Sequence, residues 1–174
     1  MGHSHGQAAV IFAPALMNPA KALLDLCRDR RLKIATAESC TGGLLAALLT
    51  EIPGSSHVFE RGFVTYSNEA KSELLGVSDV LLARHGAVSQ EVAHAMAVGC
   101  LDRSNVDLSV SVTGVAGPGG GSAQKPVGLV YLACLRRGHA PVPAKLMLGD
   151  RSRQEIREAG VIEALRLLKS QAAR

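Results

Sequence analysis

The chain has 174 residues, which suits a single domain that buries roughly 70% of the surface of its unfolded chain. Hydrophobic residues make up 47% of the sequence and aromatic residues only 3%, with no tryptophan, so a core of Ala, Leu, Val and Ile is expected. The net charge of +4 is scattered, and basic patches interleaved with base-stacking aromatic residues are missing, which argues against specific nucleic-acid binding. A modest positive field favours a phosphorylated small-molecule substrate instead.

The sequence carries no pattern typical of export, membrane insertion or metal binding. The apolar segment 8–17 has no Lys or Arg before it, unlike a signal peptide, and no apolar run reaches the length of about 18 residues that spans a bilayer. The four cysteines include no C-x-x-C pair and the six histidines show no metal-ligand spacing, so neither a metal nor another cofactor is expected. Reduced, buried cysteines fit a cytoplasmic protein.

Helices and strands are predicted to alternate along the chain after a flexible tail at residues 1–17, within one domain at 18–174. In chain order we expect a helix at 19–30, a strand at 32–36, a helix at 41–49, a strand at 58–66, helices at 68–75, 78–84 and 90–101, strands at 106–113, 127–135 and 142–148, and a helix at 152–170.

Two local patterns support these assignments. Leu23 and Cys27 have the spacing of an amphipathic helix, and Ser152 with Glu155 matches a capping box at the start of the last helix. The last two strands read as an antiparallel hairpin. The sum is an α/β domain with helices on both faces of a mixed, mostly parallel sheet.

The segment 37–43 joins the first predicted strand to the helix that follows it. A hydroxyl at such a turn faces the unpaired N–H groups of the first helical turn, which can hold an oxyanion, a carboxamide oxygen or a phosphate. Ser39 is therefore a candidate nucleophile, although the same position also suits a serine that only caps its helix. Cys40, a rival nucleophile, is expected to point into the core. The expected oxyanion donors are the N–H groups of Thr41, Gly42 and Gly43.

Lys71 lies where a cation is unfavourable for helix stability. If Asn68 caps its helix, Lys71 falls in the first turn, near the partly positive helix N-terminus, and no carboxylate occupies the positions three or four residues away. Partial desolvation there is expected to lower the pKa of the amine, so that a neutral amine can act as base for a serine nucleophile. Tyr66 can relay protons or fix the amine. The alternative is an exposed lysine that points to water.

A glycine-rich loop at residues 114–122 follows the end of a predicted strand, where open α/β sheets bind ligands. Glycines allow a close approach to a ligand, and consecutive N–H groups can nest an anion. The loop matches neither of the two common nucleotide-binding fingerprints, and a loop without a ligand remains the alternative. The residues expected to bind substrate in this region are Thr113, Gly114, Gly117 and Gly119, with Arg151 as a phosphate-binding side chain.

Three motifs, in order, closely resemble the CinA C-terminal domain family. They are Ala37-Glu38-Ser39-Cys40-Thr41-Gly42-Gly43, the segment 62–71 and the segment 112–120, with further matches at 125–128, 149–151 and 156–157. The similarity runs from about residue 32 to residue 168. This family includes nicotinamide-nucleotide amidases, which convert nicotinamide mononucleotide to nicotinate mononucleotide and ammonia.

The resemblance implies a three-layer α/β/α fold, no metal cofactor, and a Ser–Lys mechanism with an acyl-enzyme, in which Ser39 is the nucleophile, Lys71 the base and Tyr66 assists. Many relatives carry an additional N-terminal domain, and this chain is expected to be the stand-alone form. Two alternatives stay open: a non-catalytic module for phosphorylated-ligand binding or competence-related interactions, and a Ser–Lys amidase for another small substrate. A homo-oligomer is expected, with no membrane partner.

Overall fold

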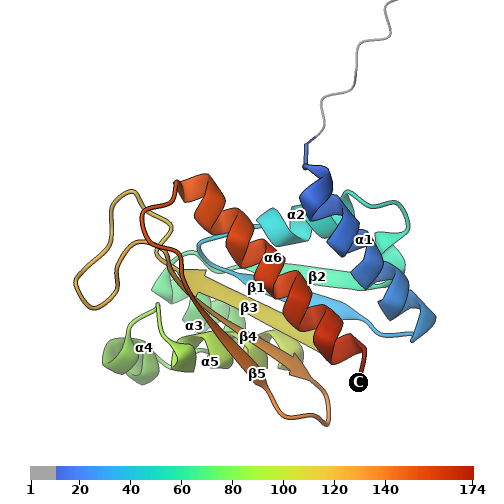
Figure 1. Cartoon of the computed structure of the whole chain (residues 1–174). Helices are drawn as coiled ribbons and strands as arrows, with labels where there is room; N and C mark the ends of the chain where they lie inside the picture. The colour runs from blue at the N-terminus through green and yellow to red at the C-terminus, as the bar shows by residue number, and fades with distance from the viewer. Residues whose placement is uncertain (1–10) are drawn as a thin grey trace, which may run out of the picture.

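A five-stranded sheet runs through the middle of the computed structural model, which describes residues 11–174 (Figure 1). The strands are β1 (Ile34–Glu38), β2 (Phe59–Val64), β3 (Leu108–Gly114), β4 (Leu129–Arg136) and β5 (Val142–Met147), in the spatial order β2-β1-β3-β4-β5. Strand β1 pairs parallel with β2 and β3, while β4 pairs antiparallel with β3 and with β5. Only β4 therefore opposes the other strands, which confirms the predicted mixed, mostly parallel sheet.

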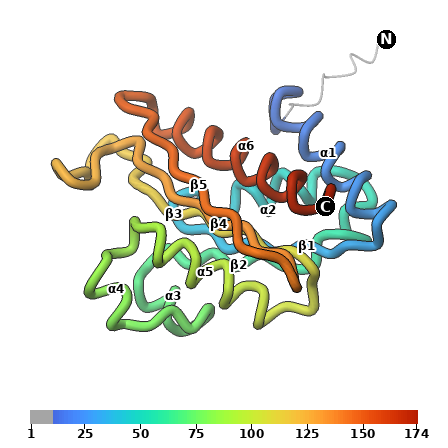
Figure 2. Tube along the Cα trace, turned by 60° about the horizontal axis from the view of Figure 1, so that its bottom comes forward, coloured from blue at the N-terminus to red at the C-terminus, as the bar shows by residue number. Residues whose placement is uncertain are grey.

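Helices cover both faces of this sheet (Figures 1 and 2). One face carries α1 (Pro14–Asp29), α2 (Leu44–Thr50) and α6 (Arg153–Ala172). The other face carries α3 (Asn68–Leu75), α4 (Asp79–His85) and α5 (Gln90–Asp102). A short 3-10 turn, Ser55–His57, precedes β2. The three-layer α/β/α architecture is confirmed.

The two central parallel strands are buried on both faces, because each lies between two helical layers. In β3 the apolar side chains face one layer, and a row of hydroxyls faces the other. The hydroxyls of Ser109, Ser111 and Thr113 donate to backbone carbonyls of α5 or of the segment before it, at 2.8, 2.5 and 2.9 Å. The hydroxyls on the polar face of β3 are therefore hydrogen-bonded to the backbone of the neighbouring helical layer rather than to solvent.

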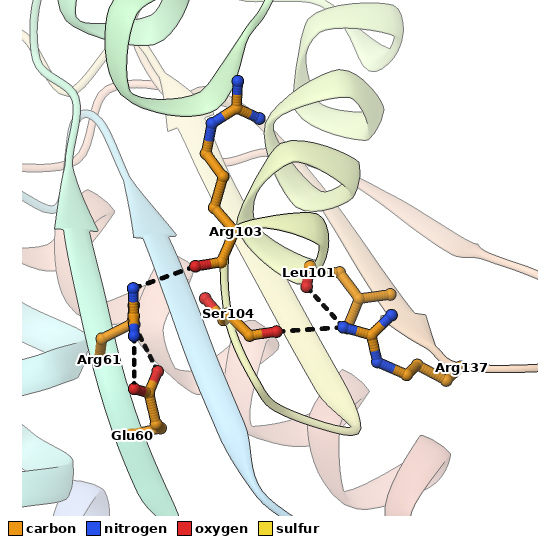
Figure 3. Close-up of polar contacts among 6 residues, drawn as sticks. All are labelled: Glu60, Arg61, Leu101, Arg103, Ser104 and Arg137. Atoms are coloured by element: carbon orange, nitrogen blue, oxygen red, sulfur yellow. Dashed lines mark hydrogen bonds and ion pairs between the residues drawn. The ribbon is translucent and has the colours of Figure 1, made fainter.

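Arginines close the C-terminal end of α5 (Figure 3). Arg137 Nη2 donates to the carbonyls of Leu101 and Ser104, at 2.8 and 3.1 Å, and Arg61 Nη1 donates to the carbonyl of Arg103 at 3.0 Å. Cations are favoured where helix carbonyls lack partners. Part of the positive charge of the chain is thus bound to its own backbone.

The N-terminal boundary differs from the prediction. Helix α1 begins at Pro14 rather than Pro19, because Leu16 packs into the core in the first helical turn and Phe12 is buried just before it. The expected flexible tail at 1–17 is therefore wrong for its last residues, while residues 1–10 lie outside the described part of the chain.

The four cysteines are free and buried. Burial raises the pKa of the Cys40 thiol to about 11 and the pKa values of Cys27, Cys100 and Cys134 to about 12. Within residues 11–174 no helix is both long and apolar enough to cross a bilayer.

Candidate active site

Ser39 directly follows the last residue of β1, because the strand ends at Glu38 rather than at the predicted Thr36. Its backbone N–H donates to the carbonyl of Val112 in β3 at 2.9 Å, so the serine is held between two parallel strands at their carboxyl ends. Helix α2 has Gly43 as its N-cap and no side-chain cap. The interpretation of Ser39 as a capping residue is therefore wrong.

Lys71 reaches Ser39 from α3, across 32 positions of sequence. Its side chain is only 1% exposed, and Nζ lies 3.0 Å from Oγ of Ser39. Nζ also donates to the carbonyl of Thr65 at 2.8 Å and lies 3.4 Å from the carbonyls of Tyr66 and Ser67. The helix is capped by Ser67, not by the predicted Asn68. The predicted convergence of the serine and the lysine is thus present in the structure.

The environment of Lys71 favours its neutral form. Desolvation by burial lowers the pKa of its amine and outweighs the opposite effect of the nearby Cys40. Within residues 11–174 no carboxylate lies within hydrogen-bond reach of Nζ; its partners are one hydroxyl and three carbonyls. A lysine buried without a counter-ion is costly for folding when it is charged. The site therefore disfavours the ammonium and suits a free amine.

Glu38, which the sequence interpretation missed, organises the turn around Ser39. Its buried carboxylate accepts hydrogen bonds from the N–H groups of Gly43 and Leu45, both at 3.1 Å, and of Ala46 at 2.9 Å. These are the donors that the start of α2 would otherwise leave unpaired. The signal for this role was an acidic residue close before a helix N-terminus. The backbone carbonyl of Glu38 also accepts from Thr65 N–H at 2.8 Å.

This arrangement changes the set of available oxyanion donors. The N–H of Gly43 is bound to Glu38, and the N–H of Gly42 donates to the carbonyl of Ser39 at 3.0 Å. Two of the three predicted donors, the N–H groups of Gly42 and Gly43, are therefore already used. Within the described chain, the N–H groups of Cys40 and Thr41 have no acceptor. The side chain of Cys40 belongs to the apolar core, as predicted.

Tyr66 lies next to the pair, but its phenol does not contact it. The side chain is 61% exposed, and its hydroxyl accepts a hydrogen bond of 3.0 Å from Nη2 of Arg153. Only the backbone carbonyl of Tyr66 approaches Lys71. The position of Tyr66 at the end of a strand was enough to predict that this residue lies near Ser39 and Lys71. The direction of its phenol, in contrast, depends on Arg153, which lies 87 positions away in the sequence.

Two predicted polar contacts fall elsewhere. The hydroxyl of Thr113 donates to the carbonyl of Ala87 and is buried, and the side chain of Thr41 is fully buried. Arg151 is exposed, and its side chain forms no hydrogen bond within residues 11–174. Arg153 is the arginine that contacts the glycine-rich loop, because it donates to the carbonyl of Gly117 at 2.7 Å as well as to the hydroxyl of Tyr66.

The model of the CinA C-terminal domain family matches residues 17–172. The chain belongs to the CinA C-terminal domain family. It is 47% identical over 165 residues to a CinA-like protein of Akkermansia muciniphila, covering 91% of this chain and 40% of that protein. It is 54% identical over 145 residues to a CinA-like protein of Mycobacterium marinum, covering 83% of this chain and 33% of that protein. The chain thus spans well under half the length of these curated relatives.

Solved structures of the CinA superfamily share the fold. The competence/damage inducible protein CihA from Agrobacterium tumefaciens superposes with a TM-score of 0.92 at 46% identity, covering 95% of this chain and 100% of that one. A CinA superfamily protein from Escherichia coli has a TM-score of 0.85 at 30% identity, covering 100% of this chain and 99% of that one.

In this CinA domain the glycines of the 114–122 loop serve two purposes. A Cβ at Gly114 would lie 2.7 Å from the carbonyl of Leu129, and one at Gly117 would lie 2.6 Å from Val127, so packing requires glycine at both positions. Gly119 has no heavy atom within 4 Å of a Cβ and lines an open pocket of about 570 Å³. Of the predicted binding glycines in this loop, Gly119 is therefore the one that faces open space.

Proposed function

We propose that this chain is a Ser–Lys amidohydrolase that converts nicotinamide mononucleotide to nicotinate mononucleotide and ammonia. One observation carries the reaction type: the amine of a buried lysine without a carboxylate partner lies 3.0 Å from a serine hydroxyl at the carboxyl end of a parallel strand. A desolvated amine of lowered pKa is a suitable general base at neutral pH. The substrate rests on the resemblance to nicotinamide-nucleotide amidases and on the family membership.

The proposed reaction proceeds in two halves. Lys71 accepts the proton of the Ser39 hydroxyl while Oγ attacks the carboxamide carbon, and the N–H groups of Cys40 and Thr41 stabilise the resulting oxyanion. Lys71 then donates its proton to the leaving nitrogen, ammonia departs, and an ester to Ser39 remains. Water attacks this ester with Lys71 again as base, which releases the carboxylic acid and restores the serine hydroxyl.

The deciding experiment measures ammonia release by the purified chain from nicotinamide mononucleotide, its riboside and free nicotinamide. We expect turnover of the mononucleotide, with kcat/KM for the other two compounds at least tenfold lower. If the mononucleotide binds but no ammonia forms even at stoichiometric protein, the chain is a ligand-binding module instead. If only a different carboxamide is hydrolysed, the Ser–Lys chemistry stands and the substrate assignment fails.

The pH dependence follows from the lowered pKa of Lys71. Catalysis needs the neutral amine, so kcat/KM should fall as the pH falls through this lowered pKa and level off above it. Between that value and the ordinary value of 10.5, the unfolded chain binds one more proton than the folded chain, so stability rises with pH. Wild type should accordingly gain stability relative to Lys71→Met as pH increases in this window. Parallel stability curves for the two proteins would contradict the assignment of a free amine.

A further inference from the structure

A pocket of about 530 Å³ is lined by residues of α1, α2 and α6 and of the segment just before α1. These three helices lie on the face of the sheet opposite α5 (Figure 2). Its apolar wall includes Phe12, Leu16 and Leu44. Its charged side chains are Arg153, Arg157 and Glu158, all from the first turns of α6. An apolar wall with a few converging polar groups is the usual composition of a small-molecule site.

The two arginines in this pocket have no counter-ion. They lie four residues apart, hence on one face of α6, and like charges at this spacing repel each other. Within residues 11–174 neither forms an ion pair with a carboxylate. The carboxylate of Glu158 accepts instead from the amide of Gln154 at 2.8 Å. The Nε of Arg157 is buried without any hydrogen-bond partner. Arg153 is exposed and Arg157 is half-buried, so the pocket presents two cationic groups whose charge a bound anion can balance.

We propose that this pocket binds a phosphate monoester, with Arg153 and Arg157 as the two sides of a clamp. Guanidinium groups match phosphate oxygens in geometry, and two of them balance a dianion better than a monocarboxylate. The apolar wall accommodates the organic part of the ligand. This assignment replaces Arg151, the arginine expected from the sequence.

Both arginines also contact the segments that carry the catalytic pair. Nη2 of Arg157 donates to the carbonyl of Thr41 at 2.9 Å, two residues after Ser39, and Arg153 holds the phenol of Tyr66. A phosphate bound between the two arginines is therefore linked, through Arg157 and Arg153, to the segments that hold Thr41 and Tyr66 beside the proposed active site. It comes either from the substrate itself or from a separate phosphorylated metabolite, and the recognition chemistry is the same.

The binding test uses phenyl phosphate and benzoate with the full chain, measured by isothermal titration calorimetry. We expect phenyl phosphate to bind at least tenfold more tightly than benzoate, and Arg153→Met and Arg157→Met each to weaken it at least tenfold. Arg166→Met is the matched control, because Arg166 lies further along α6, paired with Glu163 and outside the pocket, and it should change affinity less than twofold. Absence of phenyl phosphate binding, or equal affinity in all variants, would overturn the proposal.

Arg157→Met also removes a contact to Thr41, so its folding is checked by the thermal midpoint, and Arg153→Met carries the test alone if Arg157→Met fails to fold. A second arm, which rests on the proposed function, adds phenyl phosphate to the ammonia-release assay. Competition that raises KM identifies the substrate's own phosphate as the ligand, whereas a change in kcat at constant KM identifies a separate metabolite; both support the clamp. The calorimetric arm needs no turnover, so failure of the amidase assignment and failure of the clamp are distinguishable.

Discussion

Replacing Lys71 with methionine is expected to lower kcat for ammonia release by about 10³-fold or more, the usual contribution of a general base that also activates the nucleophile. Within residues 11–174, Lys71 is the only titratable side chain that hydrogen-bonds to Oγ of Ser39. Methionine keeps an unbranched apolar chain in this fully buried position, so the protein should stay folded. Arginine should fail equally, because its guanidinium remains protonated. The measurement is steady-state ammonia release, with circular dichroism to confirm folding.

Two matched variants make this test specific. Ser39→Ala should lose as much activity as Lys71→Met, and the double variant should lose little more, because the two groups act as one unit. Cys40→Ala should remain active within about threefold, since burial holds the pKa of this thiol at about 11 and its side chain lies in the core. A Lys71→Met protein that keeps more than a tenth of wild-type turnover would disprove the role of this lysine.

Replacing Glu38 with glutamine is expected to lower the free energy of unfolding by about 2–4 kcal/mol, and turnover with it. The carboxylate accepts three backbone N–H groups with its two oxygens, whereas a glutamine amide directs an NH₂ group toward at least one of these donors. The start of α2 would shift, and Ser39 lies in the turn that leads to it. Urea unfolding, read together with kcat, measures both effects.

Glu155→Gln is the control for this change, because Glu155 caps the start of α6 from an exposed position. Its loss of stability should be clearly smaller than that of Glu38→Gln, and its kcat unchanged. Equal losses for the two variants would mean that the buried carboxylate does no more than an ordinary helix cap.

The order of the elements was predictable because each has a local cause. Apolar periodicity predicted the helices and strands, and the predicted cap Ser152 marked the start of α6 correctly. The lysine was predictable because a cation at that position is unfavourable for helix stability, and the serine because it lies where a strand turns into a helix. What sequence alone did not contain was the competition for donors at the start of α2, where Glu38 occupies the N–H of Gly43.

The choice between two arginines shows where a finer prediction was available. Ser152 was expected to cap the last helix, and this cap places Arg153 and Arg157 on one helical face while Arg151 precedes the helix. Helical spacing counted from the cap would have favoured Arg153. The phenol of Tyr66 could not be placed in this way, because its direction is set by that same arginine across the fold.

The carbonyl of Glu38 accepts from Thr65 N–H, and the carbonyl of Thr65 in turn accepts from Nζ of Lys71. Ser39 and Lys71 are thus both connected to the peptide unit between Glu38 and Ser39. Ser39 is connected through the covalent chain, and Lys71 through these two hydrogen bonds in series. When the edge strand β2 fluctuates, the side chains of Ser39 and Lys71 should therefore move together. This common attachment should keep the distance between Nζ of Lys71 and Oγ of Ser39 constant, even though β2 is an edge strand.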